Sequence, residues 1–250
     1  MREWISGRNP VLETLRAGRR RAFRLLVAQG AQPEPRLAEI LKLCRQRGVP
    51  VEYVPRSTLD ATAAGHQGVA LEASEYPYSN VADILDLAAA RQEALFVLIL
   101  DILQDPQNLG ALLRSAEIVG VHGVVLPLRR TATVTPAVVH ASSGASEYLL
   151  IVQANLAQAI RMLKDHGAWV VGLESGAEGL PPERVRLDGS LALVVGSEAE
   201  GMRPLVRASC DLLLQLPMRG RIASYNAAVA GSIALYLAWQ ARGFPGRVSS

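Results

Sequence analysis

The sequence predicts an α/β fold, and three observations carry this prediction. Short apolar runs alternate with helical patterns along almost the whole chain of 250 residues, as expected for α/β proteins. Half of the residues are hydrophobic and 20% are charged, a composition that excludes a disordered chain. The unbroken run LFVLIL at 95–100 is typical of a parallel strand buried on both faces.

The first 75 residues are predicted to form a compact unit. Asn9 is a candidate cap for a helix with Pro10 in its first turn, and Gly18 ends that helix. Further patterns predict strands at 23–28, 49–54 and 69–73, and helices at 37–47 and 57–65. The segment SEYPYSN then predicts a linker, so the expected domains are 1–75, a linker with a connecting helix at 76–93, and 94–250.

The second part of the chain repeats the alternation of strands and helices. Asn80 is a candidate cap for the connecting helix. Buried strands are predicted at 95–100, 123–126, 147–152, 169–173, 191–195 and 212–216, and a long final helix at 223–241. The longest apolar run, 227–239, has 13 residues, whereas a membrane-spanning helix needs about 20. We therefore expect no membrane span.

The distribution of charge points to a polyanionic partner. The formal net charge is only +3, yet residues 1–60 and 201–250 are both basic and the segment between them is acidic. All but two of the 26 basic residues are arginine, whose planar fork suits phosphate. An arginine-rich composition with a solvated surface would give the same pattern, so charge alone leaves both interpretations open. Two cysteines without metal-ligand spacing, and an N-terminus without an apolar leader segment, favour a cytoplasmic setting and predict no metal site.

Three polar loops follow three of the predicted strands, and ligand sites in parallel sheets lie beyond the carboxyl ends of strands. The loops are DILQDPQNLGALLR at 101–114, GSEAEG at 196–201 and LPMRGRIASYN at 216–226. Each has a purely structural alternative. Asn108, Ser224 and Asn226 would suit helix caps, and Arg114 and the two glutamates would suit a solvated surface. None of the loops matches a dinucleotide fingerprint or a phosphate-binding P-loop, which argues against a nicotinamide-dependent oxidoreductase.

Taken together and in this order, the motifs NLGALLR, VVGSEAEGM and LPMRGRIASYNAAVA resemble those of the SpoU (TrmH-type) RNA ribose 2′-O-methyltransferases of the SPOUT superfamily. The resemblance covers about residues 94–242. The segments SGRNPVLETLRAG and HQGVALE also resemble the small L30e-like substrate-binding domain of the subgroup that methylates a guanosine of large-subunit (23S) rRNA near the peptidyl-transferase centre. This resemblance implies an α/β domain with a C-terminal trefoil knot, S-adenosyl-L-methionine as cofactor, and a homodimer.

The resemblance also assigns roles to individual residues. It implies a catalytic set of Arg114, Asn108, Glu198, Ser224 and Asn226. It implies cofactor contacts, largely through the backbone, by Gly196, Leu216, Tyr225, Met218 and Asn226. Tyr225 stands where the family commonly has leucine, which is a departure from the pattern around the adenine.

We expect RNA to be held by arginine and by shape, because aromatic residues make up only 5% of the chain. The candidate RNA contacts are Arg8, Arg19, Arg20, Arg21, Arg24, Arg129 and Arg130. The same reaction on tRNA or on another rRNA site is one alternative. A non-catalytic RNA-binding protein of ribosome assembly is another, although the complete set of motif residues argues against it.

Overall fold

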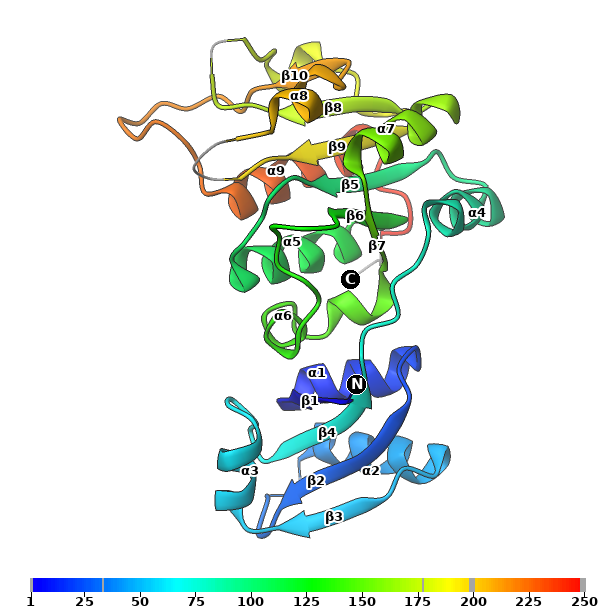
Figure 1. Cartoon of the computed structure of the whole chain (residues 1–250), viewed down its shortest axis with the longest axis vertical. Coiled ribbons are helices and arrows are strands. Elements are labelled where there is room, and N and C mark those ends of the chain that lie inside the picture. The colour runs from blue at the N-terminus through cyan, green and yellow to red at the C-terminus, as the bar shows by residue number, and fades with distance from the viewer. Residues whose placement is uncertain (1, 33, 177, 198–200, 248–250) are drawn as a thin grey trace. The chain divides into compact units, whose positions relative to one another are not determined.

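A computed structural model describes residues 2–247, apart from 33, 177 and 198–200. The chain forms two compact units (Figure 1). The first contains the residues up to Pro77 together with Thr133–Tyr148, and the second contains Tyr78–Ala132 and the residues from Leu149 onward. The segment Thr133–Tyr148 therefore packs with the first unit, whereas the sequence placed it inside the domain at 94–250.

The first unit is built on a four-stranded sheet in the order β1-β4-β2-β3. β4 pairs antiparallel with both β1 and β2, and β2 pairs parallel with β3. The strands are β1 (Arg2–Ser6), β2 (Ala22–Ala28), β3 (Val51–Val54) and β4 (Val69–Ser74), and the helices are α1 (Arg8–Ala17), α2 (Pro35–Arg47), α3 (Arg56–Thr62), α6 (Pro136–Ala141) and the 3₁₀ helix η1 (Ala145–Tyr148). The last two come from the inserted segment.

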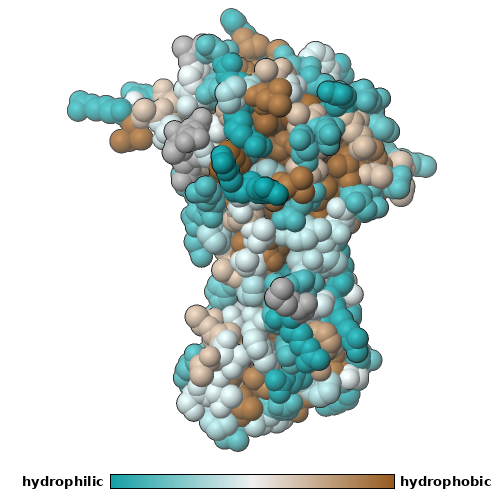
Figure 2. Space-filling view, in the orientation of Figure 1, coloured by the Kyte–Doolittle hydropathy of each residue, from teal (hydrophilic) through white to brown (hydrophobic). Residues whose placement is uncertain are grey.

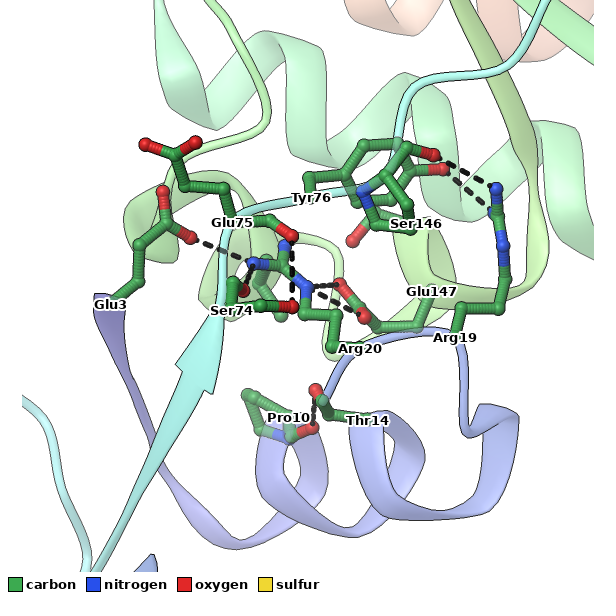
Figure 3. Close-up of polar contacts among 12 residues, drawn as sticks. Glu3, Pro10, Thr14, Arg19, Arg20, Ser74, Glu75, Tyr76, Ser146 and Glu147 are labelled. Atoms are coloured by element: carbon green, nitrogen blue, oxygen red, sulfur yellow. Dashed lines mark hydrogen bonds and ion pairs between the residues drawn. The ribbon is translucent and has the colours of Figure 1, made fainter. Parts of the chain in front are cut away.

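A buried ion pair joins the inserted segment to the rest of the first unit (Figure 3). The side chains of Arg20 and Glu147 are both fully buried, and Arg20 Nε donates to the two carboxylate oxygens of Glu147 at 3.1 and 2.9 Å. Arg20 Nη1 also donates to Glu3 at 2.7 Å and to the carbonyl of Ser74 at 3.0 Å. Buried charges are tolerated only when paired, so this contact fixes where the segment packs.

The second unit contains a six-stranded, fully parallel sheet in the order β10-β8-β9-β5-β6-β7. Its strands are β5 (Phe96–Leu100), β6 (Gly123–Pro127), β7 (Leu150–Ala154), β8 (Trp169–Leu173), β9 (Leu191–Val195) and β10 (Leu212–Leu214). Its helices are α4 (Val81–Arg91), α5 (Pro106–Ile118), α7 (Leu156–Asp165), α8 (Pro204–Ala208), α9 (Ala227–Ala241) and the 3₁₀ helix η2 (Pro182–Arg184). The expectation of an α/β fold is confirmed.

Helices cover both faces of this sheet, which is why its central strands are wholly apolar. On one face, α4, α7 and α8 pack with inward residues of the strands, including Val97, Val125 and Val194, in one buried cluster. On the other face, α9 lies so close to α5 and β9 that a Cβ at Gly231 would meet Leu112 at 2.5 Å and Val195 at 3.2 Å. The first and third motifs are carried by α5 and α9, so this close packing brings them together.

Several element boundaries differ from the sequence prediction. Gly7 rather than Asn9 precedes α1, and β1 at Arg2–Ser6 was not predicted. The strand predicted at 147–152 begins at Leu150, because Glu147 lies in η1 and turns inward to pair with the buried Arg20. The final helix begins at Ala227 rather than 223, and the strand predicted at 212–216 ends at Leu214. Asn80 forms a capping box with Asp83 at the start of α4, as predicted.

Within the part of the chain that the structure describes, no helix combines the length and hydropathy needed to cross a membrane. Among the same residues, no group of three His, Cys, Asp or Glu side chains is placed to hold a metal ion.

Candidate active site

The candidate site lies at the carboxyl edge of the parallel sheet of the second unit. β8, β9 and β5 are neighbours in that sheet and run in one direction, so the loops that follow them emerge side by side. β5 leads into the first motif and β9 into the second. The third motif follows β10, which pairs with β8. The topology therefore gathers all three motifs at one edge.

The second motif is held together by the residues on either side of 198–200. Ser197 and Gly201 exchange two backbone hydrogen bonds, at 3.0 and 3.1 Å, across the loop. Gly196 is buried, and a Cβ there would stand 2.3 Å from the carbonyl carbon of Gly201 and 2.4 Å from the nitrogen of Met202. Only glycine allows two backbone segments to approach this closely. Glu198, predicted as a catalytic residue, lies outside the described residues.

A pocket of about 610 Å³, counting the space open to solvent at its mouth, joins the second and third motifs. Its lining includes four residues of each: Val195, Gly196, Ser197 and Gly201 from the second, and Leu216, Met218, Ser224 and Tyr225 from the third, with Ala227 and Ala230 of α9 behind them. The volume lies in the range of small-molecule sites. The structure thus brings together four of the five residues predicted to hold the cofactor.

The fifth, Asn226, connects the third motif to the first. Its side-chain oxygen accepts hydrogen bonds from the backbone nitrogens of Ala228 at 2.9 Å and Val229 at 3.2 Å, which caps α9. Its Nδ2 donates to Oδ1 of Asn108 at 3.2 Å. Asn226 is therefore both a helix cap and a partner of Asn108, so the structural and functional interpretations of this residue are compatible.

The first motif places Asn108 and Arg114 on α5. Asp105 caps this helix by accepting a hydrogen bond from the backbone nitrogen of Gln107 at 3.0 Å, so Asn108 is not the cap that the structural alternative proposed. Asn108 lies in the first turn and Arg114 is exposed nearly two turns further along. The structure pairs Asn108 with Asn226.

A buried carboxylate ties the first motif to the end of the second. Asp101 follows β5 and is fully buried. Its two oxygens accept hydrogen bonds from the backbone nitrogen and from Nε of Arg203, both at 2.7 Å. Its own backbone nitrogen donates to the carbonyl of Val195 at 2.8 Å. Asp101 therefore clamps the segment that leaves the second motif against the strand that enters the first.

Three residues outside the sequence motifs also line the pocket: Leu173, Glu174 and Ser175, at the carboxyl end of β8. Glu174 receives a hydrogen bond from Nε of Arg207 at 3.1 Å. The signal was available, because a polar pair directly after a buried parallel strand obeys the same rule that selected the other loops.

The structure corrects the prediction that Arg20 contacts RNA. Its side chain is fully buried between Glu147 and Glu3 and cannot meet a phosphate. The sequence at 19–21 is a run of three arginines and does not distinguish Arg20 from its neighbours, because its main partner lies 127 positions away.

The other basic residues predicted in the first unit keep some exposure. Arg8 pairs with Glu34, and Arg24 pairs with Glu72 and Glu52. Arg19 donates to the Tyr76 hydroxyl at 2.9 Å. Arg21, which was predicted to contact RNA, is exposed and has no ion pair among the described residues, and the same holds for Arg56. In the second unit, Arg129 and Arg130 are exposed at the end of β6.

Comparisons with known proteins agree with this architecture. The SpoU rRNA methylase family model matches residues 95–236, and a model described as RNA 2′-O ribose methyltransferase substrate binding matches residues 4–79. A TrmH family tRNA/rRNA methyltransferase, YacO of Bacillus subtilis strain 168, is 38% identical over 244 residues, covering 96% of each chain. A TrmH family tRNA/rRNA methyltransferase of Staphylococcus aureus strain COL is 40% identical over 240 residues, covering 95% of this chain and 96% of the relative.

Solved structures show the same fold. The SpoU methyltransferase AviRb from Streptomyces viridochromogenes, in complex with AdoMet, has a TM-score of 0.79 at 22% identity, covering 96% of this chain and 90% of that one. An AdoMet-bound rRNA methyltransferase from Sinorhizobium meliloti has a TM-score of 0.77 at 23% identity, covering 96% and 87%.

The parallel sheet with a pocket at its carboxyl edge, together with the two family-model matches, places the chain in the class of RNA-modifying transferases. The chain belongs to the SpoU rRNA methylase family, and it is an RNA methyltransferase of the SpoU/TrmH type.

Proposed function

We propose that this protein transfers the methyl group of S-adenosyl-L-methionine to the ribose 2′-oxygen of a guanosine in large-subunit rRNA, near the peptidyl-transferase centre. The observation that carries the proposal is the pocket that joins the second and third motifs, with the Asn108–Asn226 pair linking the third motif to the first. The family models, and the AdoMet bound by two structural neighbours, support the cofactor and the reaction.

The residues of the pocket fit this cofactor. Apolar side chains such as Leu173, Val195 and Leu216 suit an adenine ring, and the backbone around Gly196 comes within reach of a ligand because no side chain stands there. Glu174 and three serines supply oxygens for hydroxyl and ammonium groups. When bound, S-adenosyl-L-methionine supplies an electrophilic methyl group.

The chain's own task is to position a ribose hydroxyl and to favour the loss of its proton. A guanidinium holds its proton too tightly to act as a base at neutral pH. Arg114 therefore acts by charge: it holds the adjacent phosphate and stabilises the developing alkoxide. Asn108, held by Asn226, orients the ribose, while Ser224 at the rim of the pocket adds a hydroxyl contact. Glu198 remains a proposed partner of this set.

The proposal extends to a homodimer, and the surface of α9 supports it. Val229, Ile233 and Tyr236 recur at helical spacing on α9 with 49%, 36% and 52% of their surfaces exposed. Ile118 at the end of α5, the helix packed against α9, is 60% exposed. A row of this kind on a folded protein marks an association surface, and a second copy of the chain is the proposed occupant. Sedimentation should give a dimer, and Val229→Asp should give a monomer.

The trefoil knot, the L30e-like character of the first unit and a cytoplasmic location complete the proposal. The knot is proposed from the family to which the chain belongs. The third motif leaves β10 beside β8 and leads into α9, which packs against α5 and β9. Figure 2 shows the intervening loop projecting from its unit with hydrophilic and hydrophobic residues side by side. That loop carries Arg219 and Arg221, which suit an RNA surface.

A tRNA substrate is the second candidate, because the relatives are described as tRNA/rRNA methyltransferases. The experiment supplies methyl-labelled S-adenosyl-L-methionine with either rRNA or tRNA, both isolated from a strain that lacks the gene. Label in the rRNA fraction supports the proposal. Label in tRNA alone would show that tRNA, not rRNA, is the substrate. Absence of label in both fractions would favour the non-catalytic alternative. Arg114→Ala is the control and should give no label.

A further inference from the structure

A groove of about 1160 Å³, counting its open side, lies beyond β6 and β7 in the second unit. Three arginines line it: Arg129, Arg130 and Arg203. Among the described residues that line it, none is acidic. Within the described residues, Arg129 and Arg130 are exposed and have no ion-pair partner.

The loop that carries Arg129 and Arg130 is anchored to the segment between β5 and the first motif. Thr131 Oγ1 and the backbone nitrogen of Ala132 both donate to the carbonyl of Leu103, at 2.9 and 2.7 Å. Arg130 adopts a φ of +60°, a left-handed conformation that is unfavourable for a non-glycine residue. Strain of this kind persists where the surroundings hold a residue in place, often at functional sites.

Arg203 approaches the groove from the second motif. Its Nε is bound to the buried carboxylate of Asp101 at 2.7 Å, while 44% of its side chain remains exposed. A guanidinium has five N–H donors in a rigid fork. The Nε–H of Arg203 donates to Asp101. The N–H groups on the two terminal nitrogens remain to donate to a phosphate in a bidentate manner.

We infer that this groove is a subsite for backbone phosphates of the RNA substrate, with Arg129, Arg130 and Arg203 as the phosphate ligands and Asp101 as the residue that positions Arg203. The inference rests on the proposed function only in taking RNA as the substrate. The loops that border the groove are hydrogen-bonded to the segments next to the first and second motifs. A phosphate bound in the groove would therefore determine which nucleotide of the RNA reaches the active site.

The test measures RNA binding directly, without turnover. The probe is protein-free large-subunit rRNA, fragmented and fluorescently labelled, titrated with the full-length protein at several salt concentrations. For Arg129→Ala with Arg130→Ala, we expect at least a tenfold loss of affinity and a salt slope reduced by about two, since each lost phosphate contact lowers it by about one. Cofactor affinity should stay unchanged. The matched control removes two exposed arginines elsewhere in the unit, Arg184 and Arg186, and should bind as the unaltered protein does.

A second set of variants tests the role of Asp101. Arg203→Gln and Asp101→Asn should each reduce the salt slope by about one. The double variant should bind RNA no more weakly than Arg203→Gln alone, because both changes remove one contact. Asp101→Asn avoids leaving a buried unpaired charge, so it keeps the test independent of folding.

Unchanged RNA affinity and salt slope in the Arg129→Ala, Arg130→Ala variant would overturn the inference. So would equal losses in the Arg184, Arg186 control, because the effect would then be general charge. If the unaltered protein binds RNA through the groove but methylates none, the proposed function fails while the inference stands.

Discussion

Replacing Asn226 separates its two roles. Asn226→Ala removes the cap of α9 and the hydrogen bond to Asn108. Loss of an N-cap costs about 1 kcal/mol, and loss of an exposed hydrogen bond costs about as much again. The free energy of unfolding should fall by about 2 kcal/mol, which corresponds to a Tm lower by about 4–8 °C in a protein of this size. Asn226→Asp keeps the cap, because aspartate caps helices equally well, but it has no amide hydrogen to offer Asn108.

Urea unfolding and methyl transfer to RNA distinguish the two variants. Asn226→Asp should unfold with the midpoint of the unaltered protein. Its rate of methyl transfer should nevertheless fall on the order of a hundredfold, because the side-chain amide of Asn108 must rotate to donate to Asp and then presents a different group to the ribose. The matched control is Asn80→Ala, which removes the cap of α4 and should cost about 1 kcal/mol without loss of turnover. Normal turnover by Asn226→Asp would refute a catalytic role for the pair. Unchanged stability of Asn226→Ala would refute the cap.

Three further predictions concern other parts of the molecule. Gly196→Ala should weaken cofactor binding at least tenfold by calorimetry, because the added Cβ would stand 2.3 Å from the carbonyl carbon of Gly201. Gly189→Ala is the control and should bind the cofactor normally, since no atom lies within 4 Å of a Cβ at that position. Burial lowers the pKa of His122 below its ordinary value of about 6.5. The unfolded chain therefore takes up a proton that the folded chain refuses, so the free energy of unfolding should fall as the pH drops below about 6.5, and His122→Gln should flatten that decline in urea titrations. Arg20→Met leaves the Glu147 carboxylate buried and unpaired, and should lower the free energy of unfolding by about 3–5 kcal/mol; a midpoint within error of the unaltered protein would contradict the assignment.

The central strands of the second unit were predictable because both of their faces are covered. A run such as 95–100 has no polar residue, so its burial can be predicted from the sequence alone. β1 was not predictable in the same way, since REWIS has two charged residues followed by two apolar residues and a serine, and its five positions show no alternation of polar and apolar residues. Its pairing with β4, 64 to 72 residues away, decides its conformation. Long-range pairings of this kind leave no local signal.

The site could be predicted from the motifs and their positions after strands, and the structure gathers Gly196, Leu216, Met218 and Tyr225 around one pocket. The fate of individual charges could not be predicted. Arg20 and Arg21 are neighbours in the sequence, but one is fully buried in an ion pair and the other is exposed.

The central claim is tested most directly by mapping the methylated nucleotide. Large-subunit rRNA from a strain that lacks the gene is incubated with the protein and S-adenosyl-L-methionine, digested, and analysed by mass spectrometry for ribose methylation. A single 2′-O-methylguanosine near the peptidyl-transferase centre, formed by the unaltered protein and absent with Arg114→Ala, is the expected result. No ribose methylation in any RNA, or unchanged methylation by Arg114→Ala, would contradict the account.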